Sequence, residues 1–211
     1  MKSLTRISLC GAMAMLALST GCSDGQSLSE KQPTQWKTCS ALFGRKNMES
    51  LRSILDSDDL KFSNRALSVD QLKKGLTQEA IDPYDKLKGF KEYETCGLSG
   101  NGHFAATVRW AADSLKSVQT NTERWQRANA EVYVADPSGV GGDVDLVFSC
   151  AIRGASGQAQ VLLEARVSAP DTPRVSEAFH QQLAVKLARM LRDELACTNE
   201  PNIPDNLDVP G

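Results

Sequence analysis

Residues 144–167 read VDLVFSCAIRGASGQAQVLLEARV, and this stretch decides the fold. Apolar residues alternate with other residues along 144–152 and again along 159–167, which is typical of strands buried on one face. The glycine-containing segment 154–157 separates the two runs and favours a tight turn. The sequence therefore predicts an antiparallel β-hairpin in the C-terminal third of the chain.

A long amphipathic helix is predicted directly after this hairpin. Apolar residues recur every fourth position from Val175 to Leu195, and Ala184 widens the stripe. Thr172 followed by Pro173 is typical of a helix N-cap and first position. We expect this helix to end near residue 197 and to pack on the hairpin.

Shorter elements are predicted upstream. Apolar residues at helical spacing begin at Trp36, Met48 and Val69, with Asn47 and Ser68 as candidate N-caps of the second and third helices. Alternation predicts strands over 90–96, 103–110 and 131–135, the first two joined through 97–102. Helices, then strands, then one long helix indicate an α+β domain. We expect an antiparallel sheet with short N-terminal helices and the long C-terminal helix packed on it.

The composition is that of an ordinary globular protein. The chain has 211 residues, a net charge of −2, 41% hydrophobic residues and 24% charged residues. These values exclude collagen-like, coiled-coil and disordered classes, and the balanced charge argues against nucleic acid as a partner. The six cysteines are the unusual feature.

The first residues are typical of an export signal. Lys2 and Arg6 precede the apolar run 7–18, which is too short to span a bilayer and is followed by LSTGC at 18–22. Small residues leading into Gly-Cys resemble a bacterial lipobox, which implies that Cys22 is diacylated and begins the mature chain. The alternative is ordinary cleavage that releases a secreted protein.

Four segments follow from this interpretation. Residues 1–21 form a signal peptide, and the polar stretch 22–34 forms a lipidated flexible tether. Residues 35–197 form a single α+β domain. The remaining 198–211, with three prolines and three acidic residues, reads as a disordered acidic tail. No other stretch is apolar enough to cross a membrane.

Four cysteines remain after Cys10 is removed with the signal peptide and Cys22 is lipidated. In an exported protein, Cys39, Cys96, Cys150 and Cys197 predict two disulfides, for which three connectivities are possible. We favour Cys39–Cys96 and Cys150–Cys197, because each pair ties a helix end to a strand in its own half. A metal site is disfavoured, since these cysteines are far apart in sequence and the chain has two histidines.

No group of residues in the sequence predicts catalysis or a cofactor. His103 and His180 lie off the apolar faces of their elements, so we expect both at the solvated surface. Asp143 and Asp145 share a strand face and are expected to point to water. The chain lacks the Gly-x-Ser-x-Gly and His-Glu-x-x-His motifs of common hydrolases. We expect no enzyme activity and no metal site.

The assembled features resemble those of small actinobacterial lipoproteins of uncharacterised function. The matching features are the lipobox at Cys22, the early Trp36-x-x-Cys39 helix, a second cysteine at Cys96, and a late hairpin with Cys150. This resemblance implies a protein at the cell membrane on its extracytoplasmic face, held by palmitate-type acyl chains. It implies no known activity.

Two functions from different classes fit these expectations best, and a hydrolase with an unfamiliar site is a third alternative. The first is a non-enzymatic binding or interaction module outside the cytoplasmic membrane, with a protein or envelope component as partner. The second is a carrier or sensor for an apolar small ligand held between the sheet and the long helix. Residues expected to line the cavity of such a carrier are Phe148, Leu163, Phe179 and Leu183.

Overall fold

A computed structural model of the protein describes residues 28–57, 59–81, 91–135, 142–155, 161–170, 172 and 175–207. The predicted signal peptide over 1–21 and the candidate lipidation site Cys22 lie outside these residues. Within the part that the structure describes, no helix combines the length and hydropathy that a membrane span requires.

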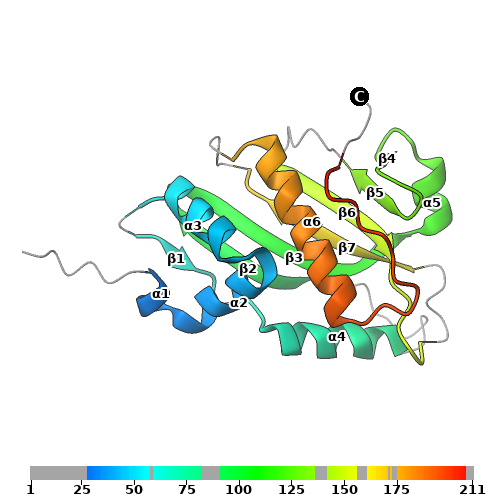
Figure 1. Ribbon diagram of the computed structural model, residues 1–211, viewed down its shortest axis with the longest axis horizontal. Coiled ribbons are helices and arrows are strands. Elements are labelled where there is room, and N and C mark those ends of the chain that lie inside the picture. Colours follow the sequence, from blue (N-terminus) through cyan, green and yellow to red (C-terminus); the bar gives the residue numbers. More distant parts are fainter. Residues whose placement is uncertain are drawn as a thin grey trace, which may run out of the picture.

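The centre of the protein is a seven-stranded antiparallel sheet in the order β1-β2-β3-β7-β6-β5-β4 (Figure 1). The strands are β1 (Lys61–Phe62), β2 (Tyr93–Gly100), β3 (Gly102–Ser114), β4 (Trp125–Arg127), β5 (Val132–Ala135), β6 (Asp143–Ser149) and β7 (Val161–Ser168). β3 pairs with β7, so the β2–β3 and β6–β7 hairpins lie side by side. The predicted hairpin over 144–167 and the α+β class are confirmed.

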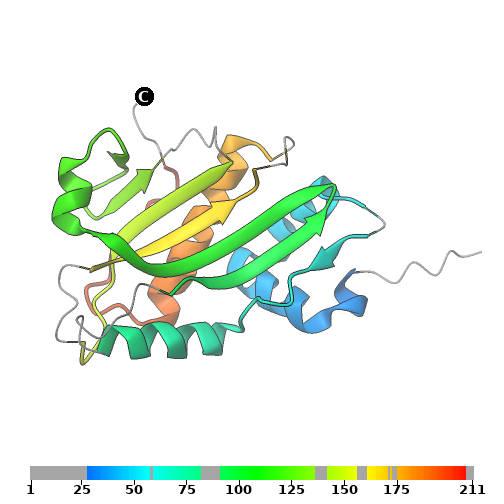
Figure 2. The same ribbon diagram turned by 180° about the vertical axis from the view of Figure 1, so that it is seen from behind.

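Most helices cover one face of this sheet. The helices are α1 (Leu28–Lys31), α2 (Pro33–Phe43), α3 (Arg45–Ile54), α4 (Val69–Ile81), α5 (Leu115–Thr120) and α6 (Glu177–Glu194). α6 crosses β6 and β7, and α2 lies beside it against β2 (Figure 1). On the opposite face, which Figure 2 shows toward the viewer, α5 is the one described helix that packs against the sheet. We call these the covered face and the open face.

The covered face carries the main core. In the register of the central strands, Val108 of β3 lies opposite Ala165 of β7, which lies opposite Leu146 of β6. All three side chains are buried and belong to the same hydrophobic core as the apolar stripe of α6. The predicted stripe is confirmed at its buried positions, which are Leu183, Ala184, Leu187, Ala188, Leu191 and Leu195.

Two disulfides fasten helices to strands. Cys39 of α2 bonds Cys96 of β2, and Cys150 after β6 bonds Cys197 after α6. All four residues are buried. The pairing favoured from the sequence is the one present.

The N-terminal helices begin earlier than predicted. α1 occupies Leu28–Lys31, and Pro33 stands in the first turn of α2, where a missing N–H costs nothing. Leu28 is buried, and the Gln32 side-chain oxygen accepts a hydrogen bond of 2.8 Å from the Phe62 N–H of β1. The predicted tether over 22–34 is therefore wrong for residues 28–34, which belong to the folded domain.

The predicted N-cap of α4 is confirmed, and that of α3 is wrong. Ser68 and Gln71 form a reciprocal capping box, with side-chain oxygens accepting from each other's backbone N–H at 3.3 and 3.0 Å. α3 starts at Arg45 directly after Gly44, whose φ is +82°. The Asn47 amide instead donates to the Phe43 carbonyl at 2.9 Å.

The turn between β2 and β3 is shorter than predicted. Residues 97–100, expected in a connecting loop, continue β2, and β3 begins at Gly102. A Cβ at Gly100 would collide with the Leu55 carbonyl oxygen, so glycine permits the hairpin to approach the end of α3. The same carbonyl accepts a hydrogen bond from the Asn101 N–H at 3.1 Å.

Thr172 does not cap α6. The helix begins at Glu177, and the Ser176 hydroxyl accepts from the Phe179 N–H at 3.3 Å. Thr172 is buried, and its hydroxyl donates to the His103 carbonyl at 3.0 Å and accepts from the His103 N–H at 3.2 Å. It therefore fastens the segment before α6 to β3, which is a long-range role that local sequence does not reveal.

The C-terminal segment is packed. Ile203 and Leu207 are buried in the main core, and Arg189 of α6 donates to the Ile203 carbonyl at 2.9 Å. Arg189 also forms an ion pair of 2.7 Å with Asp205. We call residues 198–207 the C-terminal strap. The predicted disordered tail is therefore wrong for these residues, while 208–211 lie outside the described part.

Candidate functional site

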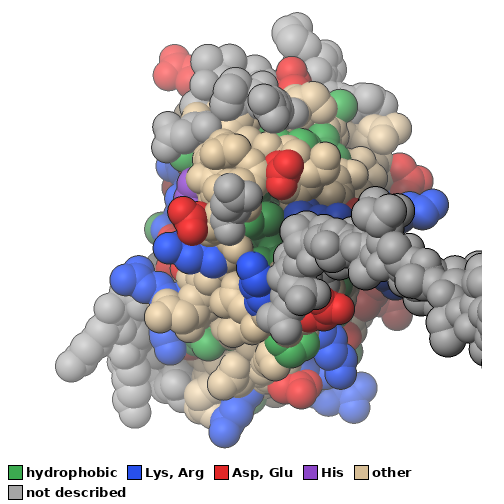
Figure 3. Space-filling view, turned by 90° about the vertical axis from the view of Figure 1, so that its left-hand side faces the viewer, with side chains coloured by type: hydrophobic (Ala, Val, Ile, Leu, Met, Phe, Trp, Pro, Cys, Tyr) green, Lys and Arg blue, Asp and Glu red, His purple; other side chains and the backbone are tan. Residues whose placement is uncertain are grey.

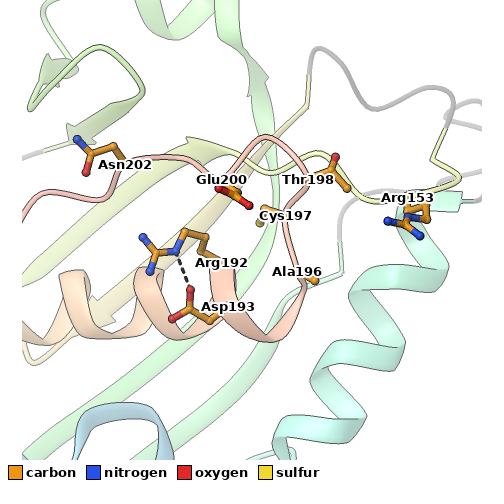
Figure 4. Close-up of a pocket in the computed structure, with 8 residues that line it drawn as sticks. All are labelled: Arg153, Arg192, Asp193, Ala196, Cys197, Thr198, Glu200 and Asn202. Carbon is orange, nitrogen blue, oxygen red and sulfur yellow. Dashed lines mark hydrogen bonds and ion pairs between the residues drawn. The ribbon is translucent and has the colours of Figure 1, made fainter.

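A cleft opens where α6 ends and the C-terminal strap begins (Figure 4). Its volume is about 780 Å³, within the range of cavities that hold small ligands. The lining residues are Arg153, Arg192, Asp193, Ala196, Cys197, Thr198, Glu200 and Asn202. We call it the C-terminal cleft.

The end of α6 forms one wall of this cleft. The Cys197 N–H donates to the Arg192 carbonyl at 3.1 Å, and the Ala196 N–H donates to the Asp193 carbonyl at 3.2 Å. These two bonds define a Schellman motif, which places Ala196 at the position that usually holds glycine. Ala196 has a φ of +50°, in the left-handed region that non-glycine residues rarely adopt. The C-terminal disulfide, through Cys197, fixes the chain immediately after this strained residue.

A hydrogen-bonded turn forms the next wall. Thr198 donates through its N–H to the Ala151 carbonyl at 2.8 Å, and the Ala151 N–H donates to the Asn199 side chain at 2.8 Å. The Glu200 N–H closes the turn on the Cys197 carbonyl at 3.0 Å. Glu200 has a φ of +45° and is exposed. Glu200 and Ala196 are the non-glycine residues with positive φ in the described part of the chain, and both line this cleft.

The far side of the strap is held by residues of the connection between β4 and β5. The Asn202 N–H donates to a Glu131 carboxylate oxygen at 2.7 Å, and the Asn129 amide donates to the Asn202 carbonyl at 2.7 Å. These bonds use the backbone of Asn202 and leave its exposed side chain at the cleft. The cleft is therefore preformed, because its walls are fixed on both sides of the strap.

Charges of both signs line the cleft. The Arg192 guanidinium donates to the Asp193 carboxylate at 2.7 Å. The pKa of Arg192 is raised, chiefly by this hydrogen bond, with a smaller contribution from the negative charge of Glu200. Arg153 is exposed, and it forms no ion pair with the other residues that the structure describes. Figure 4 shows Glu200 beside Arg192, with Arg153 on the other side of Thr198.

This arrangement suits binding of a polar ligand. The lining offers guanidinium donors, carboxylate acceptors and an amide on rigid supports. Two arrangements common in catalysis, a buried carboxylate pair and a nucleophile hydrogen-bonded to a base, are not found among the residues that line this cleft.

A second, smaller cleft lies between α5 and β4. Its volume is about 550 Å³, and its lining includes Val118, Trp125 and Tyr133. Trp125 is 3% exposed and Tyr133 is 5% exposed, so both rings form the base of this cleft and offer a ligand little accessible surface. The C-terminal cleft offers more accessible polar groups, so we take it as the candidate site.

The residues predicted to line an apolar cavity lie elsewhere. Phe148, Leu163 and Leu183 have no exposed surface and belong to the continuous core between the sheet and α6. Phe179 is partly buried against the same core. None of the four lines either of the two clefts.

The two histidines differ from each other. His103 is exposed, as predicted, and its Nδ1 lies 3.2 Å from the Ser99 hydroxyl. The expectation that His180 is solvated is wrong, because it is 3% exposed at the start of α6. Its Nε2 has no hydrogen-bond partner in the described part. Burial lowers the pKa of His180, and the charge of Asp143 opposes this shift.

The expectation that Asp145 points to water is also wrong. It is buried on the open face, where its carboxylate accepts from the Arg166 guanidinium at 2.9 Å. Arg166 lies 3.4 Å from Glu164, which accepts from Arg109 at 2.8 Å. The hydrogen bond to Asp145 is the main cause of the raised pKa of Arg166. These four residues pair with each other across β3, β7 and β6, which leaves few free charges for a ligand.

The end of the molecule that carries α1, α3 and β1 shows no accumulation of one charge. Figure 3 looks onto this end, and Lys and Arg side chains are interspersed there with Asp and Glu. The exposed side chains of Lys46 and Lys61 share this end with Asp56 and Asp59. A mixed surface of this kind is typical of a solvated face.

Comparisons with known proteins do not add a family. Scans against protein-family models, curated proteins and solved structures each gave no match. The class defined by fold and site is thus an antiparallel α+β domain with two disulfides and a polar cleft.

The residues of the C-terminal cleft do not stand out in the sequence, because the prolines and acidic residues of 198–211 are typical of a disordered acidic tail. One signal for a packed strap was available. Pro201, Ile203 and Leu207 are spaced apolar residues after a cysteine, and each is buried. Nothing local pointed to Arg153, which reaches the cleft from the β6–β7 connection through tertiary folding.

Proposed function

We propose that the protein is a lipoprotein held through Cys22 on the outer face of the cytoplasmic membrane, comparable to the small actinobacterial lipoproteins that its sequence resembles. The lipobox-like LSTGC at 18–22 supports an anchor of this kind. Two disulfides agree with an extracytoplasmic location, because disulfides persist in oxidising compartments. Two acyl chains together give stable membrane attachment.

Metabolic labelling with a palmitate analogue tests the anchor. The intact protein is expected to take up the label and to sediment with membranes, whereas Cys22→Ala is expected to lose both properties. A variant Cys10→Ala serves as the matched control, because it removes a cysteine inside the predicted signal peptide. Equal labelling of Cys22→Ala and the intact protein contradicts the anchor.

At this location, the protein acts as a non-enzymatic binding module for a protein or envelope component. The observation that carries this role is the C-terminal cleft, whose walls are fixed by a disulfide and by backbone hydrogen bonds. Binding sites gain affinity when their groups are ordered in advance, because less entropy is lost on association. A rigid polar cleft on an exported domain fits this function better than a catalytic role.

Complementation of a deletion strain tests the binding role. Arg153→Ala and Glu200→Gln are expected to fold and localise normally but to fail to restore the wild-type phenotype to the deletion strain. His103→Ala is the control and is expected to restore it fully. Loss of complementation by His103→Ala, with retention by the two cleft variants, overturns the assignment.

The apolar-ligand carrier receives less support. The residues that would line its cavity, Phe148, Leu163 and Leu183, have no exposed surface. A carrier needs space between the sheet and the helix, whereas these side chains fill the main core. Native mass spectrometry of the purified protein checks this alternative, since a carrier co-purifies with its ligand.

A further inference from the structure

The C-terminal cleft has two oppositely charged ends, which we call its negative and positive poles. At one pole, the carboxylates of Asp193 and Glu200 accompany the single guanidinium of Arg192, so negative charge is in excess. At the other pole, Arg153 stands without an ion-pair partner among the described residues. Thr198 lies between the two poles (Figure 4).

The end of α6 strengthens the negative pole. Carbonyl groups at a helix C-terminus carry partial negative charge and favour a cation nearby. α6 is 18 residues long and ends at Glu194, next to the wall formed by Asp193 and Ala196. A ligand ammonium group at this pole would meet two carboxylates and the helix end.

The backbone at Glu200 is an independent reason to assign a role to its side chain. Glu200 adopts a φ of +45°, where glycine or asparagine would be less strained. Its N–H is held by the Cys197 carbonyl, and its carboxylate forms no ion pair within 4.0 Å among the described residues. Strain of this kind concentrates at functional sites, where the surrounding structure maintains it. The backbone of Glu200 is therefore held in place, and its carboxylate is available to a ligand.

We propose that the C-terminal cleft binds a short zwitterionic peptide, whose amino group lies beside Glu200 and Asp193 and whose carboxylate pairs with Arg153. The side-chain amide of Asn202 supplies neutral hydrogen-bonding groups along the cleft. The Thr198 hydroxyl donates its proton to the Ala151 carbonyl at 3.1 Å and is left to accept a hydrogen bond from a ligand. This proposal rests on the proposed binding function and names its ligand class. Free peptides and the peptide parts of envelope polymers share this chemistry.

Titration of the purified full chain with tri-alanine tests the proposal by calorimetry. N-acetyl-tri-alanine lacks the ammonium group, and tri-alanine amide lacks the carboxylate. Each modified peptide is expected to bind about tenfold more weakly than tri-alanine, because each loses one charge-assisted contact. A peptide isolated from an envelope polymer, compared with tri-alanine, distinguishes the two natural sources.

Two variants assign the poles. Arg192 already pairs with the Asp193 carboxylate at 2.7 Å, so Glu200 supplies the uncompensated negative charge. Glu200→Gln is therefore expected to bind tri-alanine and its N-acetyl form nearly equally, and Arg153→Gln is expected to bind tri-alanine and its amide nearly equally. Glu177→Gln, at the opposite end of α6, and Lys116→Gln, on α5, are matched controls that should keep the full preferences.

Absence of binding by any peptide, or equal affinity for all three forms, overturns the proposal. Unchanged preferences in Glu200→Gln and Arg153→Gln also overturn it. The Cys22-dependent labelling and the complementation experiment are measured separately. A failed ligand class is therefore distinguishable from a failed anchor or a failed binding function.

Discussion

The two disulfides place the same covalent bond in two different settings. Cys39–Cys96 lies inside the core, where α2 meets β2, and neither cysteine has exposed surface. Cys150–Cys197 lies at the edge of the domain, and Cys197 lines the C-terminal cleft. The two cysteines of each bond are separated by similar lengths of sequence, 57 residues in the first bond and 47 in the second. The difference teaches that one bond secures the fold, whereas the other also shapes a surface.

Removal of either disulfide should cost the most stability. Because the two loops are similar in length, the paired replacements Cys39→Ala with Cys96→Ala, and Cys150→Ala with Cys197→Ala, are each expected to lower the free energy of unfolding by about 4 kcal/mol. Urea titration followed by circular dichroism measures both losses.

Affinity for the peptide should distinguish the two disulfides, whereas the loss of unfolding free energy should not. Under conditions in which both double variants are folded, only the variant at residues 150 and 197 should lose affinity for tri-alanine. Equal loss of affinity in both variants would show that the cleft has no special dependence on the nearby disulfide.

A single truncation in the core should have the next largest effect. Leu187 is fully buried on α6, so Leu187→Ala is expected to cost about 3 kcal/mol through lost burial and an added cavity. Asn202→Ala, at the exposed cleft, should change stability by less than about 0.5 kcal/mol. Thermal and urea unfolding of both variants check this contrast, and a comparable cost at Asn202 would contradict it.

Acid should weaken the fold at the other end of α6. Burial lowers the pKa of His180 in the folded protein, so the unfolded chain binds a proton more readily. Stability should therefore be complete above the ordinary pKa of about 6.5 and should fall below it, by at most about 1.4 kcal/mol per pH unit. Unfolding free energies of the intact protein and His180→Gln between pH 7.5 and 5 measure this effect. An identical pH dependence in both proteins would exclude His180 as its cause.

Relief of backbone strain at the cleft should raise the free energy of unfolding, by less than the losses described above. Ala196 adopts a left-handed conformation in the Schellman motif, where glycine carries no steric penalty. Ala196→Gly is expected to raise the unfolding free energy by about 1 kcal/mol. Ala188→Gly, in the interior of α6, is the matched control and should lower it by about that amount plus the cost of lost burial. A destabilised Ala196→Gly would contradict the assigned strain.

Much of the fold was predictable because its signals are local. Alternation along 144–167 and the four-residue apolar spacing of α6 identify their elements, since both patterns follow from which face is buried. The disulfide pairing followed from the position of the cysteines in each half. The start of α6 was misplaced because Thr172 uses its hydroxyl for a contact with His103, which lies 69 positions away.

The candidate site was harder to predict because it is assembled over long range. Arg153, Arg192 and Glu200 come from a strand connection, a helix end and a strap, and no spacing rule links them. His180 and Asp145 are polar residues that tertiary contacts bury, against the expectation from their position on each element. The composition correctly indicates an ordinary globular domain, but it carries no information about which residues have a strained backbone.

The most direct test of the central claim uses Glu200→Gly in paired measurements of stability and binding. If the left-handed backbone is maintained for the carboxylate, this variant should gain about 1 kcal/mol in unfolding free energy. It should also lose the preference for tri-alanine over its N-acetyl form. A variant that is less stable than the intact protein, or that keeps this preference, would contradict the account.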